Sequence, residues 1–125
     1  FTLLGHSLGA RLLFCALEAL GTREETRVQD AVLMGGAVGN DKPEDWEVAA
    51  SAVGGSIHNC LSENDDVLRY LYQGANLGMS TPVGLHGAPQ ASGKVKNHDF
   101  SDLVGGHNEW KAQLPHVLER LGIGA

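Results

Sequence analysis

The most constraining feature of this chain is the pentapeptide Gly5-His6-Ser7-Leu8-Gly9, a G-x-S-x-G motif. The apolar residues 1–4 before it are typical of a short strand, and Leu13 and Leu17 after it recur with the period of an amphipathic helix. A turn this sharp brings the two backbones together, so we expect glycine to be required two positions before and two after the serine. The motif predicts that Ser7 lies at the carboxyl edge of a parallel sheet with its hydroxyl exposed.

Further along the chain, short apolar runs continue to alternate with helix-like segments, which predicts β-α units. We expect an α/β fold, a partial one that begins at the strand before Ser7, with a parallel sheet and helices on both of its faces. The 125 residues suit one domain, so we assign 1–125 to a single unit. The later strands are predicted at 31–34, 56–61 and 95–100, the helices near 43–52, after Ser62 and up to Leu121, and a long loop at 74–94.

Charge excludes several classes of function. The chain has 9 Lys and Arg against 15 Asp and Glu, a net charge of -6. Phosphate contacts need clustered positive charge, so we expect neither nucleic-acid binding nor electrostatic attachment to anionic membranes. No apolar run reaches the length of about 18 residues that a membrane-spanning helix needs. We expect a cytoplasmic chain, with membrane association only through segments outside it.

The cysteines and histidines give no sign of a metal or of a disulfide. Cys15 and Cys60 do not form a C-x-x-C pair, and we expect both to be small buried hydrophobic side chains. No two histidines or cysteines have a spacing typical of metal ligands. The prediction is a chain without a metal or an organic cofactor.

A serine hydroxyl is a weak nucleophile unless a base activates it and an acid orients that base. In sheets with a G-x-S-x-G turn, the acid and then the histidine follow the serine in the chain. Glu63, Asp65 and Asp66 follow the strand predicted at 56–61, and Asp65 is the preferred acid, with Asp66 as the alternative. Asp65 is also well placed simply to favour the start of the next helix.

Six histidines compete for the role of base. His107 is preferred, because it follows the last predicted strand in a Gly-Gly-His loop and precedes the final helix. His98 is the second candidate, inside that strand. The others are expected to play structural or surface roles: His6 packing at the turn, His58 hydrogen-bonded in the core, His86 in the long loop and His116 on the last helix.

These residues together predict a serine hydrolase that acts on an ester or related acyl bond. Ser7 attacks, His107 moves the proton, Asp65 orients His107, and the N–H of Leu8 donates to the developing oxyanion. Transfer of the acyl group to another acceptor would use the same residues. The alternative from a different class is a non-catalytic module that binds a protein or lipid partner, because a fold does not guarantee its function.

Four segments resemble, in order, the transmembrane-and-coiled-coil-domain-4-like α/β-hydrolases, which carry domain of unknown function 726. They are Thr2–Arg11, Val32–Ala37, Asn59–Asp65 and Ser101–His107. The resemblance implies an α/β-hydrolase fold with a serine-hydrolase site at Ser7, Asp65 and His107. A whole α/β-hydrolase has about eight strands, and its nucleophile normally follows the fifth. The resemblance therefore implies that 1–125 is the C-terminal half of one such domain.

Overall fold

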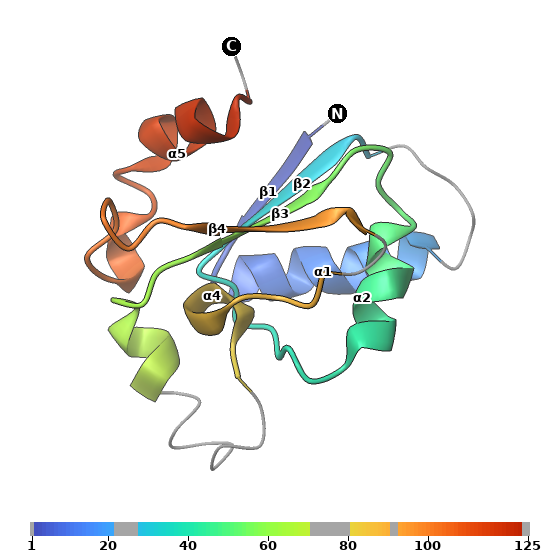
Figure 1. Cartoon of the computed structure of the whole chain (residues 1–125), viewed down its shortest axis with the longest axis horizontal. Helices are drawn as coiled ribbons and strands as arrows, with labels where there is room; N and C mark the ends of the chain where they lie inside the picture. Colours follow the sequence, from blue (N-terminus) through green and yellow to red (C-terminus); the bar gives the residue numbers. More distant parts are fainter. Residues whose placement is uncertain (1, 22–27, 71–80, 91–92, 124–125) are drawn as a thin grey trace.

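The computed structural model of the chain describes residues 2–21, 28–70, 81–90 and 93–123, and its core is one parallel sheet (Figure 1). The strands lie in the order β1-β2-β3-β4, and each neighbouring pair is parallel. The prediction of an α/β fold with a parallel sheet is confirmed. The strands are β1 (Thr2–His6), β2 (Asp30–Met34), β3 (Ile57–Leu61) and β4 (Val95–Asp99).

Helices occupy most of the connections between these strands. Pro43 lies in the first turn of α2 and Pro115 in the first turn of α5, where a missing backbone N–H costs nothing. The helices are α1 (Leu8–Gly21), α2 (Pro43–Ala50), α4 (Val83–His86), the 3-10 helix η2 (His107–Glu109) and α5 (Leu114–Leu121), and residues 66–70 are also helical. None of the helices in these described ranges is long and apolar enough to cross a membrane.

The segment 74–94, predicted to be a long loop, departs from that prediction in part. It contains the short helix α4, whose residues Val83, Gly84 and Leu85 are buried. Asn97 of β4 fastens the residues after α4, because its side chain accepts from the N–H of Ala88 and donates to the carbonyl of the same residue. Residues 74–80 and 91–92 of the segment lie outside the described residues.

Strand β2 shows that both faces of the sheet are covered. Ala31 and Leu33 belong to a core cluster with α1 and α2, whereas Val32 and Met34 belong to a second cluster with Val117 of α5. Figure 1 shows α1 and α2 on one side of the sheet and α5 on the other. A strand buried on both faces is a continuous apolar run rather than an alternating one, as residues 31–34 are.

The two cysteines have different environments, which corrects one prediction. Cys60 is buried, as expected, and burial raises the pKa of its thiol to about 12. Cys15 is exposed. Phe14 and Leu17 of α1 are buried against the sheet, and with 3.6 residues per turn the position between them points outward.

Candidate active site

The turn between β1 and α1 places Ser7 in a strained backbone conformation. Its φ is 58°, the only positive φ of a non-glycine residue in the part of the chain that the structure describes. Such a left-handed conformation costs an L-residue about 1–2 kcal/mol, and strain of this kind persists only where the surroundings enforce it. Here the N–H of Ser7 donates to the Met34 carbonyl at 3.0 Å, and the Ser7 carbonyl accepts from the Ala37 N–H at 3.3 Å.

The two glycines of the motif are not equivalent. A Cβ atom at Gly5 would lie 2.8 Å from Ala10 Cα and 2.9 Å from the Gly9 carbonyl oxygen, so only glycine fits there. A Cβ atom at Gly9 would meet nothing within 4 Å. The expectation that steric contact requires glycine at both positions is therefore wrong for Gly9, because the space around its Cβ position in the first turn of α1 is open.

Three side chains from distant parts of the chain meet beside this turn. Ser7 Oγ lies 2.7 Å from His107 Nε2, and His107 Nδ1 lies 2.7 Å from Asp65 Oδ2. Asp65 is fully buried and His107 is 6% exposed. An ionised carboxylate only accepts hydrogen bonds, so Nδ1 of His107 carries a proton and Nε2 is free to accept from the serine hydroxyl. The arrangement can move a proton from Ser7 to His107.

Asp65 holds its position through its second oxygen. Oδ1 accepts from the backbone N–H of Leu68 at 3.0 Å, in the first turn of the helical residues 66–70. The two interpretations of Asp65 from the sequence, a helix-start residue and an acid partner of the histidine, therefore apply to the same side chain. Asp66 and Glu63 are exposed.

Gly35, at the end of β2, leaves the space that this carboxylate needs. Its φ is 54°, and a Cβ atom there would lie 2.7 Å from Trp110 Nε1 and 3.0 Å from Asp65 Oδ2. Trp110 is fully buried, and its indole N–H has no hydrogen-bond partner among the described residues. Gly35 directly follows the strand predicted at 31–34, and nothing in the local sequence indicates which side chains come to lie against it.

Of the other five histidines, His6 alone is in contact with His107 among the described residues. His6 lies next to the base: its Nε2 is 3.0 Å from the His107 carbonyl oxygen. His58 Nδ1 and His98 Nε2 lie 3.0 Å apart across β3 and β4, and burial lowers the pKa of both rings. His86 and His116 are exposed.

Leu8 is the first residue of α1, and its side chain is 69% exposed. The first N–H groups of a helix have no carbonyl partner within the helix, so they are available to an anion. The N–H of Leu8 directly follows Ser7 in the chain. Among the described residues, no group of three or more His, Cys, Asp or Glu side chains has the geometry to hold a metal ion.

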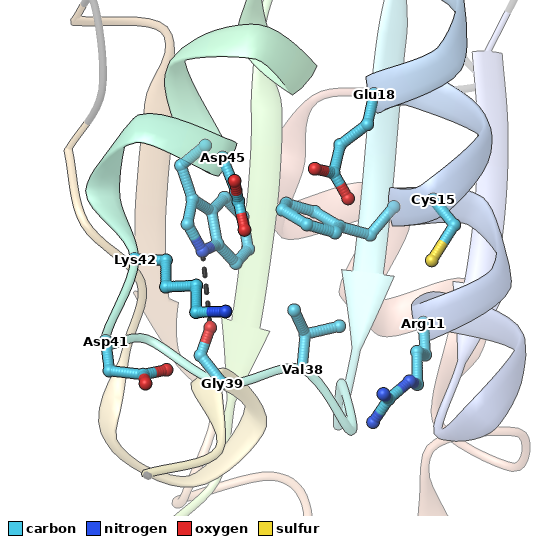
Figure 2. A pocket seen from close by; sticks show the side chains of 10 residues that line it. Arg11, Cys15, Glu18, Val38, Gly39, Asp41, Lys42 and Asp45 are labelled. Carbon is cyan, nitrogen blue, oxygen red and sulfur yellow. Dashed lines mark hydrogen bonds between the residues drawn. The ribbon is translucent and has the colours of Figure 1, made fainter.

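Two cavities are lined by residues of β1 or α1. A pocket of about 240 Å³ lies beside β1 and is lined by Leu4, Gly5, His6, Met34, Lys111 and Leu114. A cleft of about 340 Å³ separates α1 from the segment 38–46 (Figure 2). In that view Arg11 and Glu18 extend from α1 towards Lys42 and Asp45 on the opposite side. Burial and the nearby carboxylate of Asp45 raise the pKa of Glu18, and Lys42 opposes the shift.

The family described as "Protein of unknown function (DUF726)" matches residues 1–124. The chain belongs to this family. The DUF726 chain is 32% identical to "Uncharacterized membrane protein F35D11.3" of Caenorhabditis elegans, over 98% of this chain and 20% of the relative. It is 31% identical to "Probable lipase MIL1" of Saccharomyces cerevisiae, over 98% of this chain and 11% of the relative.

A third relative of the DUF726 chain is "Transmembrane and coiled-coil domain-containing protein STS1" of Oryza sativa subsp. japonica, 36% identical over 98% of this chain and 18% of the relative. The chain thus spans a fifth or less of these three curated relatives. No solved structure matches the DUF726 chain.

Proposed function

We propose that this DUF726 chain carries the catalytic residues of a serine hydrolase with an α/β-hydrolase fold, which cleaves an ester or related acyl bond. The observation that carries the proposal is the continuous path of hydrogen bonds from Ser7 Oγ through both ring nitrogens of His107 to Asp65, with both distances 2.7 Å. A serine, a histidine and a buried carboxylate in this order form the triad of acyl-transfer enzymes, which is recognised by geometry rather than by sequence position.

The reaction follows from the donors and acceptors. As Ser7 Oγ bonds to the acyl carbon, its proton passes to His107 Nε2, and the N–H of Leu8 donates to the new oxyanion. Asp65 stabilises the imidazolium. When the intermediate collapses, Nε2 gives its proton to the departing alcohol and the acyl group remains on Ser7. Water then attacks the acyl carbon while His107 Nε2 takes its proton, and the N–H of Leu8 again donates to the oxyanion. As the bond between Ser7 Oγ and the acyl carbon breaks, Nε2 returns that proton to Ser7 Oγ and the acid is released.

The comparisons support this proposal at a coarse level. One relative is named as a probable lipase, an enzyme class that cleaves acyl esters. Two others are named for membrane or coiled-coil character, which says nothing about a reaction. The class of bond is therefore proposed from the chemistry of the three side chains, and a lipid ester is one member of that class.

We also propose that 1–125 is the C-terminal half of one α/β-hydrolase domain. Within the part of the chain that the structure describes, strand β1 is at an edge of the sheet and pairs only with β2. Around it, Leu4 is 45% exposed, Leu8 69% and Leu12 73%, an apolar surface that further strands and helices of such a domain would cover. A second oxyanion donor would come from that other half, and one such donor is worth about 3–4 kcal/mol in the transition state.

The experiment therefore uses the full-length protein and a p-nitrophenyl ester. We expect hydrolysis that Ser7→Ala abolishes and that Ser51→Ala, a change of the exposed serine directly after α2, leaves intact. Residues 1–125 expressed alone should hydrolyse the ester far more slowly than the full-length protein. Equal hydrolysis by the full-length protein and its Ser7→Ala variant would refute the proposed nucleophile, and a folded, inactive protein would favour a partner-binding module.

A further inference from the structure

His6 and Ser7 are neighbours in the chain, and each contacts a different part of the same residue. Ser7 Oγ meets the ring of His107 at Nε2, 2.7 Å away. His6 Nε2 meets the backbone carbonyl oxygen of His107, 3.0 Å away. The rings of the two histidines also lie against each other, with centroids 4.9 Å apart and planes at 33°. The ring of His107 is therefore hydrogen-bonded to Ser7 and its backbone carbonyl to His6, two adjacent residues at the end of β1.

The two atoms in the contact between His6 and His107 determine which of them donates the hydrogen bond. A carbonyl oxygen only accepts, so Nε2 of His6 must carry a proton and donate it. Both the neutral ring protonated at Nε2 and the imidazolium can do so. The contact is a directed hydrogen bond that fixes the carbonyl of His107, beyond the apolar contact that two adjacent rings would make.

The segment around His107 explains why such a bond is useful. His107 follows Gly105-Gly106 and begins η2, a 3-10 helix of only three residues, so its own segment constrains it weakly. His6, in contrast, is the last residue of β1 and pairs with Met34 of β2. A hydrogen bond from His6 therefore fixes the position of His107 relative to the end of β1, and Ser7 directly follows that end.

We propose that His6 is a positioning residue that holds the backbone of His107, and through it Nε2, at hydrogen-bonding distance from Ser7 Oγ. This inference rests on the proposed function and deepens it. Catalysis depends steeply on such placement, since a displacement of about 1 Å can cost about 100-fold in rate. The hydrogen bond from His6 acts on the backbone of His107 and not on the reacting atoms, so we expect its loss to lower the rate of the chemical step rather than to weaken substrate binding.

The test compares two substitutions in the full-length protein. His6→Gln keeps an N–H donor of similar reach, and His6→Leu keeps apolar bulk without the donor. For p-nitrophenyl ester hydrolysis we expect His6→Leu to lower kcat by roughly 10- to 100-fold with KM nearly unchanged, and His6→Gln to restore most of kcat. His116→Gln, at an exposed histidine of α5, is the matched control and should match the wild type.

Unchanged kcat in His6→Leu, equal loss in both His6 variants, or a change confined to KM would overturn the proposal. A readout independent of turnover is the NMR resonance of the His107 Nδ1 proton in the bond to Asp65, in full-length protein labelled with ¹⁵N-histidine. It should persist in His6→Gln and broaden or vanish in His6→Leu. If the wild type is inactive, the proposed function fails, and this resonance alone decides the positioning role: persistence in His6→Leu would refute it.

Discussion

His107 donates from Nδ1 to Asp65 Oδ2 over 2.7 Å, and this bond joins two side chains that are 42 residues apart in the chain. Asp65 is fully buried, and its other oxygen accepts from the Leu68 N–H at 3.0 Å. Both oxygens of the carboxylate are therefore used, one for the start of a helix and one for the histidine. The bond fixes which nitrogen of His107 is free for Ser7.

The variant Asp65→Asn should keep the hydrogen bond from the Leu68 N–H and lose the one from His107 Nδ1. The amide oxygen can still accept from the Leu68 N–H, so we expect the fold to persist. The amide nitrogen facing His107 cannot accept from Nδ1, which favours the tautomer with the proton on Nε2. We predict a loss of kcat of about 10³- to 10⁴-fold for ester hydrolysis by the full-length protein. Asp66→Asn, at the exposed neighbour, should retain activity; a similar loss there would argue against Asp65 as the acid.

Gly35→Ala should destabilise the protein and impair the site together. Gly93→Ala is its control, because Gly93 also has a positive φ, 68°, but open space around its Cβ position. We expect Gly93→Ala to cost about 1–2 kcal/mol of the free energy of unfolding from backbone strain alone. Gly35→Ala should cost more and also reduce kcat, since its methyl group would displace Trp110 or Asp65. Denaturant unfolding and ester hydrolysis measure the two effects, and equal costs with full activity would contradict this account of Gly35.

Glu18→Gln should stabilise the protein at neutral pH. The pKa of Glu18 is raised above its ordinary value of 4.5 by burial and by Asp45, so the folded state disfavours the ionised carboxylate. The resulting penalty is absent below pH 4.5 and develops as the pH rises through the raised pKa. The gain in Tm from Glu18→Gln should therefore be present at pH 7 and disappear by about pH 4. Glu119→Gln on α5 is the exposed control, and a gain that persists at pH 4 would refute the explanation.

The pair His58 and His98 should make the fold sensitive to mild acid. Burial lowers the pKa of both rings below the ordinary 6.5, with Lys96 lowering both further and Asp30 opposing the shift at His58. The two rings therefore bind protons more tightly in the unfolded chain than in the folded one. Their contribution leaves the free energy of unfolding undiminished above pH 6.5, and that free energy falls as the pH drops below 6.5.

Replacing His98 tests this pair. His98→Gln should reduce the loss of the free energy of unfolding between pH 7.5 and pH 5.5, measured with denaturant, whereas the exposed-site control His116→Gln should not. An identical pH dependence in the wild type and His98→Gln would contradict the explanation.

Local patterns predicted the parts of the fold that local rules determine. The run before Ser7, the helical period of α1 and the apolar residues 31–34 are readable because each depends on neighbouring residues. The failures at Cys15 and Gly9 arose where the direction of one helix decides exposure and available space.

The candidate site was only partly accessible from sequence. Chain order and strand ends directed attention to Asp65 and His107, which the structure brings to Ser7. The fit of Gly35 against Trp110, and the bond from His6 to the His107 carbonyl, depend on how distant segments pack. No spacing in the chain carries that information, because packing is settled only by the assembled sheet and its covering segments.

The most direct test of the central claim is covalent labelling of the full-length protein with a fluorophosphonate probe, followed by mass spectrometry of the peptide that contains Ser7. The account predicts one phosphonyl adduct on Ser7 Oγ, strongly reduced by His107→Ala and unaffected by His116→Gln. A folded protein that leaves Ser7 unmodified, or that is labelled equally well without His107, would contradict it.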